Sequence, residues 1–357
     1  MAKRNLFIVL MIVFCTVAVG CSRSPLQKSE PADSDKVSSK ETLVVGFSQV
    51  GAESDWRSEN TESMKQTFTA DNGYELLFED GQQKQANQIM AVRTFIQRGV
   101  DYIVLAPVVE AGWDTVLQEA KDAGIPVIIV DRMVDVADEE LYTAWVGSDF
   151  QLEGAKASEW INQYLQAKGI HNANIVNIQG TIGATAQIGR TQGLQEACRA
   201  NSNMTLLAEV PGDFTLPKAK EVMESLLKQY DDINIVYCEN DNEAFGVIEA
   251  VEAAGKRVGS DIEAGEIMVV SFDGVKKDAM HYVLEDKISC IAECNPMQGP
   301  RVQAVIEQLE AGKEPPKFSY VDEEIYVHDE TVPSVFVENI EYPVTVVTQD
   351  VIDKRAY

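Results

Sequence analysis

The chain has 357 residues and a hydrophobic content of 45%, which is enough for two domains of ordinary size and excludes a fibrous or wholly disordered protein. Its formal net charge is −27 at pH 7. Because such an acidic surface repels phosphate backbones, the charge argues against a nucleic-acid partner.

The first 20 residues have the features of a processing signal. Lys3 and Arg4 form a basic start, "LFIVLMIVF" is an apolar segment, and "VAVGC" places small residues before Cys21. This pattern resembles the lipobox of bacterial lipoproteins, although Ala18 stands where leucine is commoner. The resemblance implies a lipoprotein signal peptide over 1–20, lipidation of Cys21, and an exported protein held at the cell membrane. An ordinary signal peptide or a membrane anchor with a chance cysteine is the alternative.

Residues 21–41 are predicted to form a disordered tether. The segment "SRSPLQKSEPADSDKVSSKE" is polar, contains proline and serine, and has no aromatic residue. Such a composition cannot bury enough apolar surface to offset the entropy lost on folding. The folded part therefore starts near Thr42.

Predicted strands and helices alternate from Thr42 onward, which is the pattern of βαβ units and a parallel sheet. "TLVVGF" precedes an amphipathic segment at 55–70, and "YELLFED" precedes a helical segment with Ile89, Val92 and Ile96 at helical spacing. "DYIVLAPV", "IPVIIVDR" and "YTAWVGSD" continue the series.

The second half repeats this scheme. Its predicted strands are "NANIVNIQG", "MTLLAEVPGDF", "INIVYCEND", "IMVVSFDG" and "SCIAECNP", and helical segments separate them. Two similar units follow each other with a change near Ser148. We therefore predict an α/β protein with two doubly wound parallel-sheet lobes.

Polar residues gather where the predicted strands end. In chain order these ends are Phe47-Ser48-Gln49, Ala106-Pro107, Asp131-Arg132, Gln179-Gly180, Asp213-Phe214, Asn240-Asp241, Asp273 and Glu293. Ligands of open α/β sheets bind at the carboxyl ends of the strands, so these side chains are expected to meet in a groove between the lobes. Carboxylates, amides and arginines bond hydroxyl groups, and aromatic faces cover the apolar side of a ring. The set suits a polyhydroxylated sugar.

Several motifs in register resemble a known family. "VGFSQVGAESDWR", "DGQQKQANQI", "IVLAPVVEAGW", "VIIVDR", "IQGTIGATAQIGRTQG", "GDF", "ENDNEAFG" and "SFDG" are similar to the type I periplasmic sugar-binding proteins of ABC importers, within the ribose- and galactofuranose-binding family and nearest to its galactofuranose binders. The resemblance covers about residues 42–315. It implies a three-crossover hinge, an N-terminal lobe of 42–148 plus 294–325 and a C-terminal lobe of 149–293 plus 326–357.

The resemblance also assigns roles to individual residues. Trp56 and Arg57 match the loop that covers the sugar, Asp131 and Arg132 match a pair that binds ring hydroxyls, and Arg190 matches an arginine of the second lobe. Together with the strand ends, the predicted sugar contacts are Gln49, Trp56, Arg57, Asp131, Arg132, Arg190, Asp213, Phe214, Asn240, Asp273 and Glu293.

Two departures bear on the ligand. Ala106 stands where the ribose binder has an asparagine, and Glu293-Cys294 stands where it has a glutamine. Trp56 and Arg57 replace two aromatic residues. These changes disfavour ribopyranose and favour a sugar with a hydroxyl-bearing arm, such as a hexofuranose resembling galactofuranose.

Simpler interpretations of single residues stay open. Asp131 and Arg132 could form a surface ion pair, Asp273 could begin an Asp-Gly turn, Trp56 could be a core anchor, and Arg190 could be a solvated helix residue. The sugar-site hypothesis depends on all the motifs occurring together.

Other chemistry has little support in the sequence. The G-x-x-x-x-G-K-[ST] and G-x-S-x-G motifs are absent, and His171, His281 and His328 lack metal-ligand spacing. We therefore expect a monomeric binding protein rather than an enzyme, with no cofactor or metal and with free cysteines. Its expected partners are a monosaccharide and, indirectly, an ABC permease and ATPase. A receptor that presents sugar to a sensor kinase or chemoreceptor is the alternative.

Overall fold

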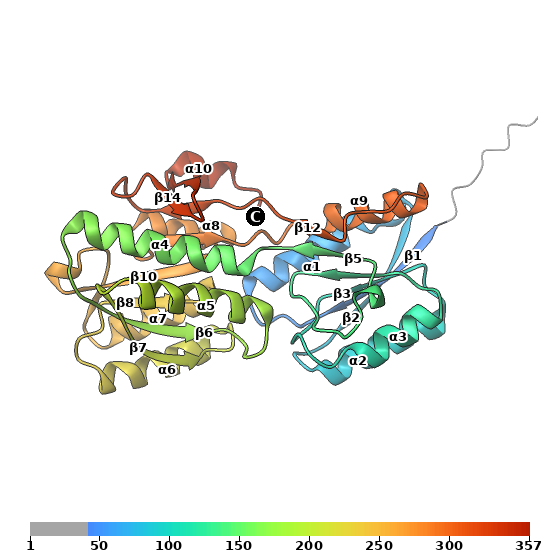
Figure 1. Ribbon diagram of the computed structural model, residues 1–357, viewed down its shortest axis with the longest axis horizontal. Coiled ribbons are helices and arrows are strands. Elements are labelled where there is room, and N and C mark those ends of the chain that lie inside the picture. Colours follow the sequence, from blue (N-terminus) through green and yellow to red (C-terminus); the bar gives the residue numbers. More distant parts are fainter. Residues whose placement is uncertain (1–41) are drawn as a thin grey trace, which may run out of the picture. The chain divides into compact units, whose positions relative to one another are not determined.

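The computed structural model describes residues 42–357 (Figure 1). The predicted signal peptide, Cys21 and the whole predicted tether lie outside the described residues. The N-terminal lobe is built from β1 (Leu43–Gln49), α1 (Asp55–Thr67), β2 (Tyr74–Asp80), α2 (Gln85–Arg98), β3 (Tyr102–Leu105), α3 (Asp114–Asp122), β4 (Val127–Val130), β5 (Ala144–Gly147), α9 (Gly299–Glu310) and β12 (Phe318–Tyr320).

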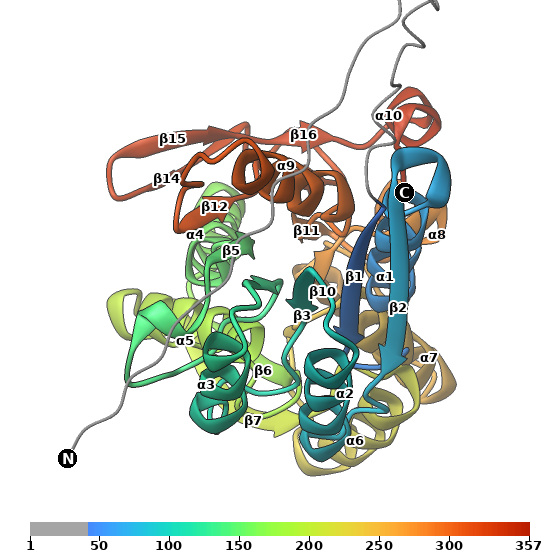
Figure 2. The same cartoon turned by 90° about the vertical axis from the view of Figure 1, so that its right-hand side faces the viewer.

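These strands form one parallel sheet in the order β12-β5-β4-β3-β1-β2. Helices α2 and α3 cover one face and α1 and α9 the other, as Figure 2 shows. All four residues of β4 are buried. The apolar run that predicts a strand covered on both faces therefore occupies that place.

The C-terminal lobe repeats the arrangement. Its elements are α4 (Phe150–Lys168), β6 (Ala173–Gln179), α5 (Thr185–Ala200), β7 (Met204–Pro211), α6 (Leu216–Gln229), β8 (Ile235–Cys238), α7 (Asp241–Ala253), β9 (Arg257–Val258), β10 (Glu266–Asp273), α8 (Lys276–Leu284), β11 (Cys290–Glu293), β13 (Ile325–Val327), β16 (Thr345–Val346) and α10 (Gln349–Lys354). The main sheet order is β16-β13-β11-β10-β8-β6-β7, and β9 pairs with β10. The α/β fold class with parallel sheets in two lobes is confirmed.

Three chain segments pass between the two sheets. They connect β5 to α4, β11 to α9, and β12 to β13. Strand β13 runs antiparallel to β11, and a hairpin of β14 (Ser334–Val337) and β15 (Ile340–Pro343) follows it. The sequence beyond Lys317, for which the motifs predict little, thus supplies the last strand of one sheet and two strands of the other.

Two smaller findings concern the helices and the thiols. The helix predicted to run to residue 70 ends at Thr67, and a short 3-10 turn at Ala70–Asn72 follows. Cys198, Cys238, Cys290 and Cys294 are free thiols. Within residues 42–357, no helix is both long and apolar enough to cross a membrane.

Candidate ligand-binding site

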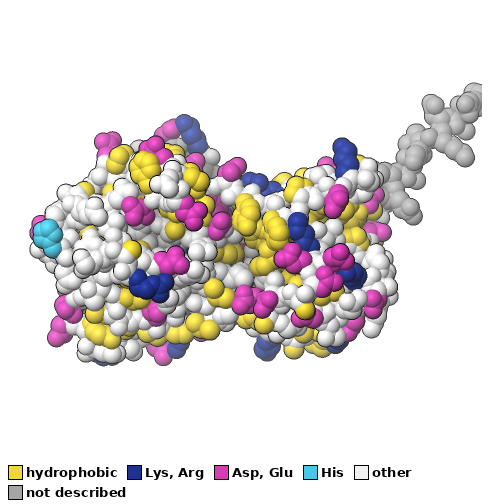
Figure 3. Space-filling view, in the orientation of Figure 1, with side chains coloured by type: hydrophobic (Ala, Val, Ile, Leu, Met, Phe, Trp, Pro, Cys, Tyr) yellow, Lys and Arg dark blue, Asp and Glu magenta, His cyan; other side chains and the backbone are white. Residues whose placement is uncertain are grey.

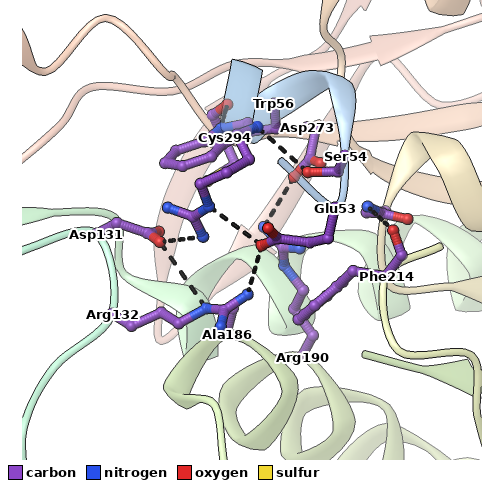
Figure 4. A pocket seen from close by; sticks show the side chains of 12 residues that line it. Glu53, Ser54, Trp56, Asp131, Arg132, Ala186, Arg190, Phe214, Asp273 and Cys294 are labelled. Carbon is purple, nitrogen blue, oxygen red and sulfur yellow. Dashed lines mark hydrogen bonds and ion pairs between the residues drawn. The ribbon is translucent and has the colours of Figure 1, made fainter. Parts of the chain in front are cut away.

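The N-terminal lobe contributes a compact set of charged side chains (Figure 4). Glu53 lies in the loop after β1, and Trp56 and Arg57 lie in the first turn of α1. Ser54 caps this helix by accepting a hydrogen bond from the Arg57 backbone N–H at 3.2 Å. The cap ends the loop at a defined position and so directs the first-turn side chains toward the end of β4.

Two arginines and two carboxylates alternate in this set. Arg57 Nη2 lies 2.7 Å from Asp131 Oδ2, and Arg57 Nε lies 3.1 Å from Glu53 Oε1. Arg132 Nη2 lies 3.4 Å from the same Glu53 oxygen, and Arg132 Nη1 donates to the Val108 carbonyl at 2.8 Å. The four charged side chains are each at most 5% exposed, so each charge depends on the others rather than on water.

The electrostatics of the set keep Glu53 ionised. Burial opposes ionisation, but the charges of Arg57 and Arg132 outweigh it and lower the pKa of Glu53. Burial and the neighbouring Arg57 lower the pKa of Arg132 to about 10, which still leaves its guanidinium charged at pH 7.

The C-terminal lobe presents a single arginine. Arg190 Nε lies 2.8 Å from Glu153 Oε2, Nη2 lies 3.2 Å from Asp273 Oδ1, and Nη1 donates to the Glu239 carbonyl. Burial works against the charge, but Glu153 and Asp273 raise the pKa of Arg190. The guanidinium is thus held at each of its three nitrogens.

Glycines allow this arginine to reach its position. A Cβ on Gly154 of α4 would lie 2.9 Å from the Arg190 Cα, and one on Gly193 of α5 would lie 2.4 Å from the Gly154 backbone. Only residues without a side chain permit α4 and α5 to approach so closely, and this approach brings Arg190 against Glu153.

An aromatic ring completes this lobe's contribution. The Phe214 backbone N–H donates to Glu243 Oε1 at 2.9 Å, and Asn240 Nδ2 donates to the Phe214 carbonyl at 3.1 Å. Gly180 makes room for the ring, because a Cβ there would lie 1.9 Å from Phe214 Cζ. The Arg132 guanidinium lies 5.2 Å from the ring centroid and so links the two lobes.

Backbone strain gathers at the same place. Asp131, Phe214 and Asp273 have φ values of 61°, 61° and 89°, in the left-handed region that non-glycine residues rarely adopt. Such residues concentrate at ligand clamps, where the surrounding contacts hold them. Asp131 directly follows β4, Asp273 ends β10, and Phe214 lies three residues after β7.

The two contributions enclose a cavity with an empty volume of about 280 Å³. It is lined by Glu53, Ser54, Trp56, Arg57, Asp131, Arg132, Ala186, Arg190, Phe214, Asn240, Asp273 and Cys294.

Comparison with known proteins identifies the family. Residues 45–324 match the Periplasmic binding protein domain. The chain belongs to the periplasmic binding protein family.

Relatives of this periplasmic binding protein include proteins with sugars in their names. It is 40% identical to the galactofuranose-binding protein YtfQ of Escherichia coli, over 80% of this chain and 88% of that protein. A Mycobacterium smegmatis structure in complex with β-D-fucofuranose is 41% identical, with a TM-score of 0.76 and coverage of 81% and 92%. The binding protein of an arabinose ABC transporter from Shewanella sp. ANA-3, bound to α- and β-L-arabinofuranose, is 38% identical, with a TM-score of 0.74 and coverage of 81% and 93%.

Most of the residues predicted from the sequence line the cavity of this periplasmic binding protein. They come from both lobes and are Trp56, Arg57, Asp131, Arg132, Arg190, Phe214, Asn240 and Asp273. The predicted convergence of strand ends brings Asp131 and Asp273 there, whereas Trp56 and Arg57 come from α1 and Arg190 comes from α5. Their contact with a ligand stays a prediction.

Three predicted residues lie outside the cavity lining. Gln49 accepts a hydrogen bond from Arg57 Nη1 at 3.2 Å and therefore supports a lining residue. Asp213 is half-buried beside Phe214, and its backbone N–H donates to the Gln179 carbonyl. Glu293 turns its carboxylate toward Arg355 and Tyr357.

Four lining residues were missed by the sequence analysis: Glu53, Ser54, Ala186 and Cys294. Glu53 and Ser54 lie in the loop "VGAESDWR", four and five residues after the end of β1. A serine that can cap the following helix, preceded by a carboxylate, is the sequence feature that could have indicated them. Cys294 lies one residue after β11, and the Trp56 indole donates to its carbonyl at 2.7 Å.

One cluster offers ligand atoms of the kind that metals use. Side-chain atoms of Glu153, Cys294 and Glu323 lie within 4.8 Å of one another. However, Arg190 already engages Glu153, Ser148 Oγ donates to Glu323 at 2.5 Å, and burial raises the pKa of Cys294 well above its ordinary value. A protonated thiol is a poor metal ligand, so the cluster does not fit a metal well.

Hydrogen-bonding capacity remains inside the cavity. Arg132 Nε and Glu53 Oε2 are buried and have no hydrogen-bond partner in the structure. Because unpaired buried polar atoms are costly, such a donor and such an acceptor point to a ligand that bonds to both.

Proposed function

We propose that this protein binds a monosaccharide in its furanose form outside the cytoplasm and delivers it to an ABC importer. The observation that carries the proposal is the cavity between the two charged sets. Arg132 Nε lies 3.9 Å from Asp131 Oδ2 but makes no hydrogen bond, and Glu53 Oε2 accepts none. A sugar hydroxyl both donates and accepts, so neighbouring hydroxyls can bond to this donor and acceptor.

The aromatic residues support a sugar ring. Trp56 from the N-terminal lobe and Phe214 from the C-terminal lobe both line the cavity and belong to one hydrophobic cluster. Aromatic faces pack on the C–H faces of a ring while the charged groups bond its hydroxyls. Closure of the two lobes on one ligand then adds contacts from both sides.

The furanose form is supported by the relatives. Proteins that are 38–41% identical have names or bound ligands that refer to fucofuranose, arabinofuranose and galactofuranose. Arg57 adds a charged donor to the loop where the ribose binder has an aromatic residue. Glu293, which stands where the ribose binder has a glutamine, bonds Arg355 instead and does not support this argument.

The family supports export and transport. Periplasmic binding proteins act outside the cytoplasm, and one relative is the binding component of an arabinose ABC transporter. Lipidation of Cys21, a monomeric state and the receptor alternative with a sensor kinase or chemoreceptor stay untested predictions.

The test combines calorimetry and crystallography. We expect D-galactose and L-arabinose to bind, each with an apparent affinity reduced by the small population of its furanose form. Co-crystals should contain a five-membered ring between Trp56 and Phe214. A six-membered ring in the cavity, or tight binding of ribose without galactose or arabinose, would contradict the furanose proposal and leave a sugar receptor. Absence of binding across pentoses and hexoses would contradict the function itself.

A further inference from the structure

Glu293 occupies a strand end beside the site, but its carboxylate is already bonded. It is the register partner of Asp273 at the ends of β11 and β10. Its Oε1 accepts from Arg355 Nη2 at 2.9 Å and from the Tyr357 hydroxyl, and its Oε2 accepts from the Glu324 backbone N–H at 2.9 Å. The side chain is 7% exposed. Both oxygens are therefore committed to protein groups.

Arg355 also holds the neighbouring strand end. Its Nε donates to the Gly274 carbonyl at 2.7 Å. Gly274 follows Asp273 directly, and both residues have left-handed backbones with φ values of 68° and 89°. One planar guanidinium thus joins the turn that presents Asp273 to the carboxylate of Glu293.

Tyr357 fills the space behind the cavity wall. It packs against the hydrophobic cluster that contains Trp56, Phe214 and Cys294, three residues of the cavity lining. Burial and the nearby Glu293 raise the pKa of its phenol, which stays protonated and donates to Glu293. The Arg355 guanidinium lies 4.4 Å from its ring centroid, so the two side chains form one unit.

We propose that Arg355 and Tyr357 are positioning residues of the sugar site. They hold Glu293 away from the cavity and brace the Asp273–Gly274 turn, so that the ligand meets Asp273, and not Glu293, on this side. This inference rests on the proposed function. It makes the segment after α10, which the sequence motifs do not cover, a determinant of which sugar hydroxyls can be bonded.

The test is calorimetric titration of the full chain with L-arabinose and D-galactose, well below each variant's melting temperature. Arg355→Met should weaken binding about tenfold, as contacting residues are commonly coupled at this level. Arg355→Lys should recover part of the loss, because an ammonium can bond Gly274 or Glu293 but lacks the planar fork. Lys354→Met, at an exposed neighbouring cation, is the control and should bind as the wild type does.

Glu293→Gln separates positioning from direct contact. If Glu293 does not touch the sugar, this variant should bind within about threefold of the wild type, since it loses a charge but can still accept one bond. Equal losses for Glu293→Gln and Asp273→Asn would overturn the inference and make Glu293 a direct contact.

Folding of the variants is checked by thermal melts. If Arg355→Met does not fold, Tyr357→Phe carries the test, because it removes one hydroxyl and keeps the ring; a loss of about threefold is expected, and unchanged affinity would overturn the inference. If the wild type binds sugar and the Arg355→Met variant binds it with the same affinity, this inference is wrong and the proposed function stands. A wild type that binds no sugar rejects the proposed function and this inference with it.

Discussion

The two lobes present their arginines in different ways. In the N-terminal lobe Arg57 and Arg132 share Glu53 and Asp131, and Arg132 Nε lies 3.9 Å from Asp131 Oδ2 without a hydrogen bond. In the C-terminal lobe Arg190 bonds three protein groups, which belong to α4, to β10 and to the residue directly after β8. The first set thus has hydrogen-bonding capacity left for a ligand. In the second set, most of the hydrogen-bonding capacity of Arg190 is used by protein groups that fix its position.

This difference has a physical basis in where the charges originate. Arg190 is bonded to groups from three separate elements, so its position is determined by the packing of the whole lobe. Arg132 extends from the chain directly after β4 and makes its one short bond to a neighbouring loop carbonyl. We expect the C-terminal residues to determine the shape of the site. The N-terminal residues should account for most of the discrimination between ligands.

The charged side chains on the surface differ from the arginines inside the site. Figure 3 shows acidic side chains spread over the visible face with lysines and arginines among them. The site arginines, in contrast, are buried. The net charge of −27, which counts the whole chain, therefore does not predict the arginines that line the cavity.

The largest effect is expected from Arg190→Met. Removing the cation leaves Glu153 and Asp273 buried without their partner, which should lower the free energy of unfolding by about 3–5 kcal/mol and reduce sugar affinity more than a hundredfold. Chemical denaturation and calorimetry measure the two losses. Arg199→Met, an exposed arginine on the same helix, should change neither. A free energy of unfolding equal to that of the wild type would show that Arg190 does not stabilise the packing of this lobe.

Arg132→Met should separate binding from folding. We expect at least about a tenfold loss of sugar affinity, since hydrogen bonds to charged groups contribute about 1.5–3 kcal/mol. The stability loss should be smaller than for Arg190→Met, because Arg132 has fewer close protein partners. Asp131→Ala should weaken binding to a similar degree. If Arg132→Met loses more stability than Arg190→Met, the comparison between the lobes is wrong.

The two lobes should also respond oppositely to pH. Burial raises the pKa of Glu239, behind Arg190, to about 7 in spite of hydrogen bonds from Thr191 and Gly180. Between about pH 4.5 and 7 the folded state then binds more protons at this group than the unfolded state. Its contribution to stability is full below about pH 4.5 and is lost as pH rises through 7, by up to about 3 kcal/mol. Glu53, with its lowered pKa, contributes stability that is lost as pH falls.

Denaturation at several pH values tests this contrast. Glu239→Gln should reduce the fall in the free energy of unfolding between pH 4.5 and 7. Part of the fall should remain, because burial also raises the pKa of Asp241 to about 7. Glu53→Gln should leave that fall in place and reduce the loss at lower pH. An identical pH profile for wild type and Glu239→Gln would show that Glu239 is ionised throughout this range.

The smallest effect on the site is expected from Cys21→Ser. This substitution should abolish incorporation of labelled fatty acid and leave the affinity for sugar unchanged, because the site is built entirely from residues 49–357. Absence of the label from the wild type would show that Cys21 is not lipidated. A changed sugar affinity would show that the N-terminal segment influences one of the lobes.

The local pattern of residues determined the lobes and much of the site. Buried runs such as that of β4 must lie inside a covered sheet, and alternating helices require parallel strands, whose carboxyl ends meet at one edge. That reasoning, together with the family resemblance, predicts Asp131, Arg132, Asn240 and Asp273 as residues of the site. It depends only on neighbours along the chain, which the sequence lists in order.

Tertiary structure decided which groups meet across long separations. Glu293 follows the same strand-end rule as Asp273, but it bonds Arg355 and Tyr357, which lie 62 and 64 residues later. The Trp56 indole bonds the Cys294 carbonyl across 238 residues. A carboxylate at a strand end can bond a ligand or another side chain equally well, and the choice depends on what the packed fold places within about 3 Å of it, a distance that residue order does not contain.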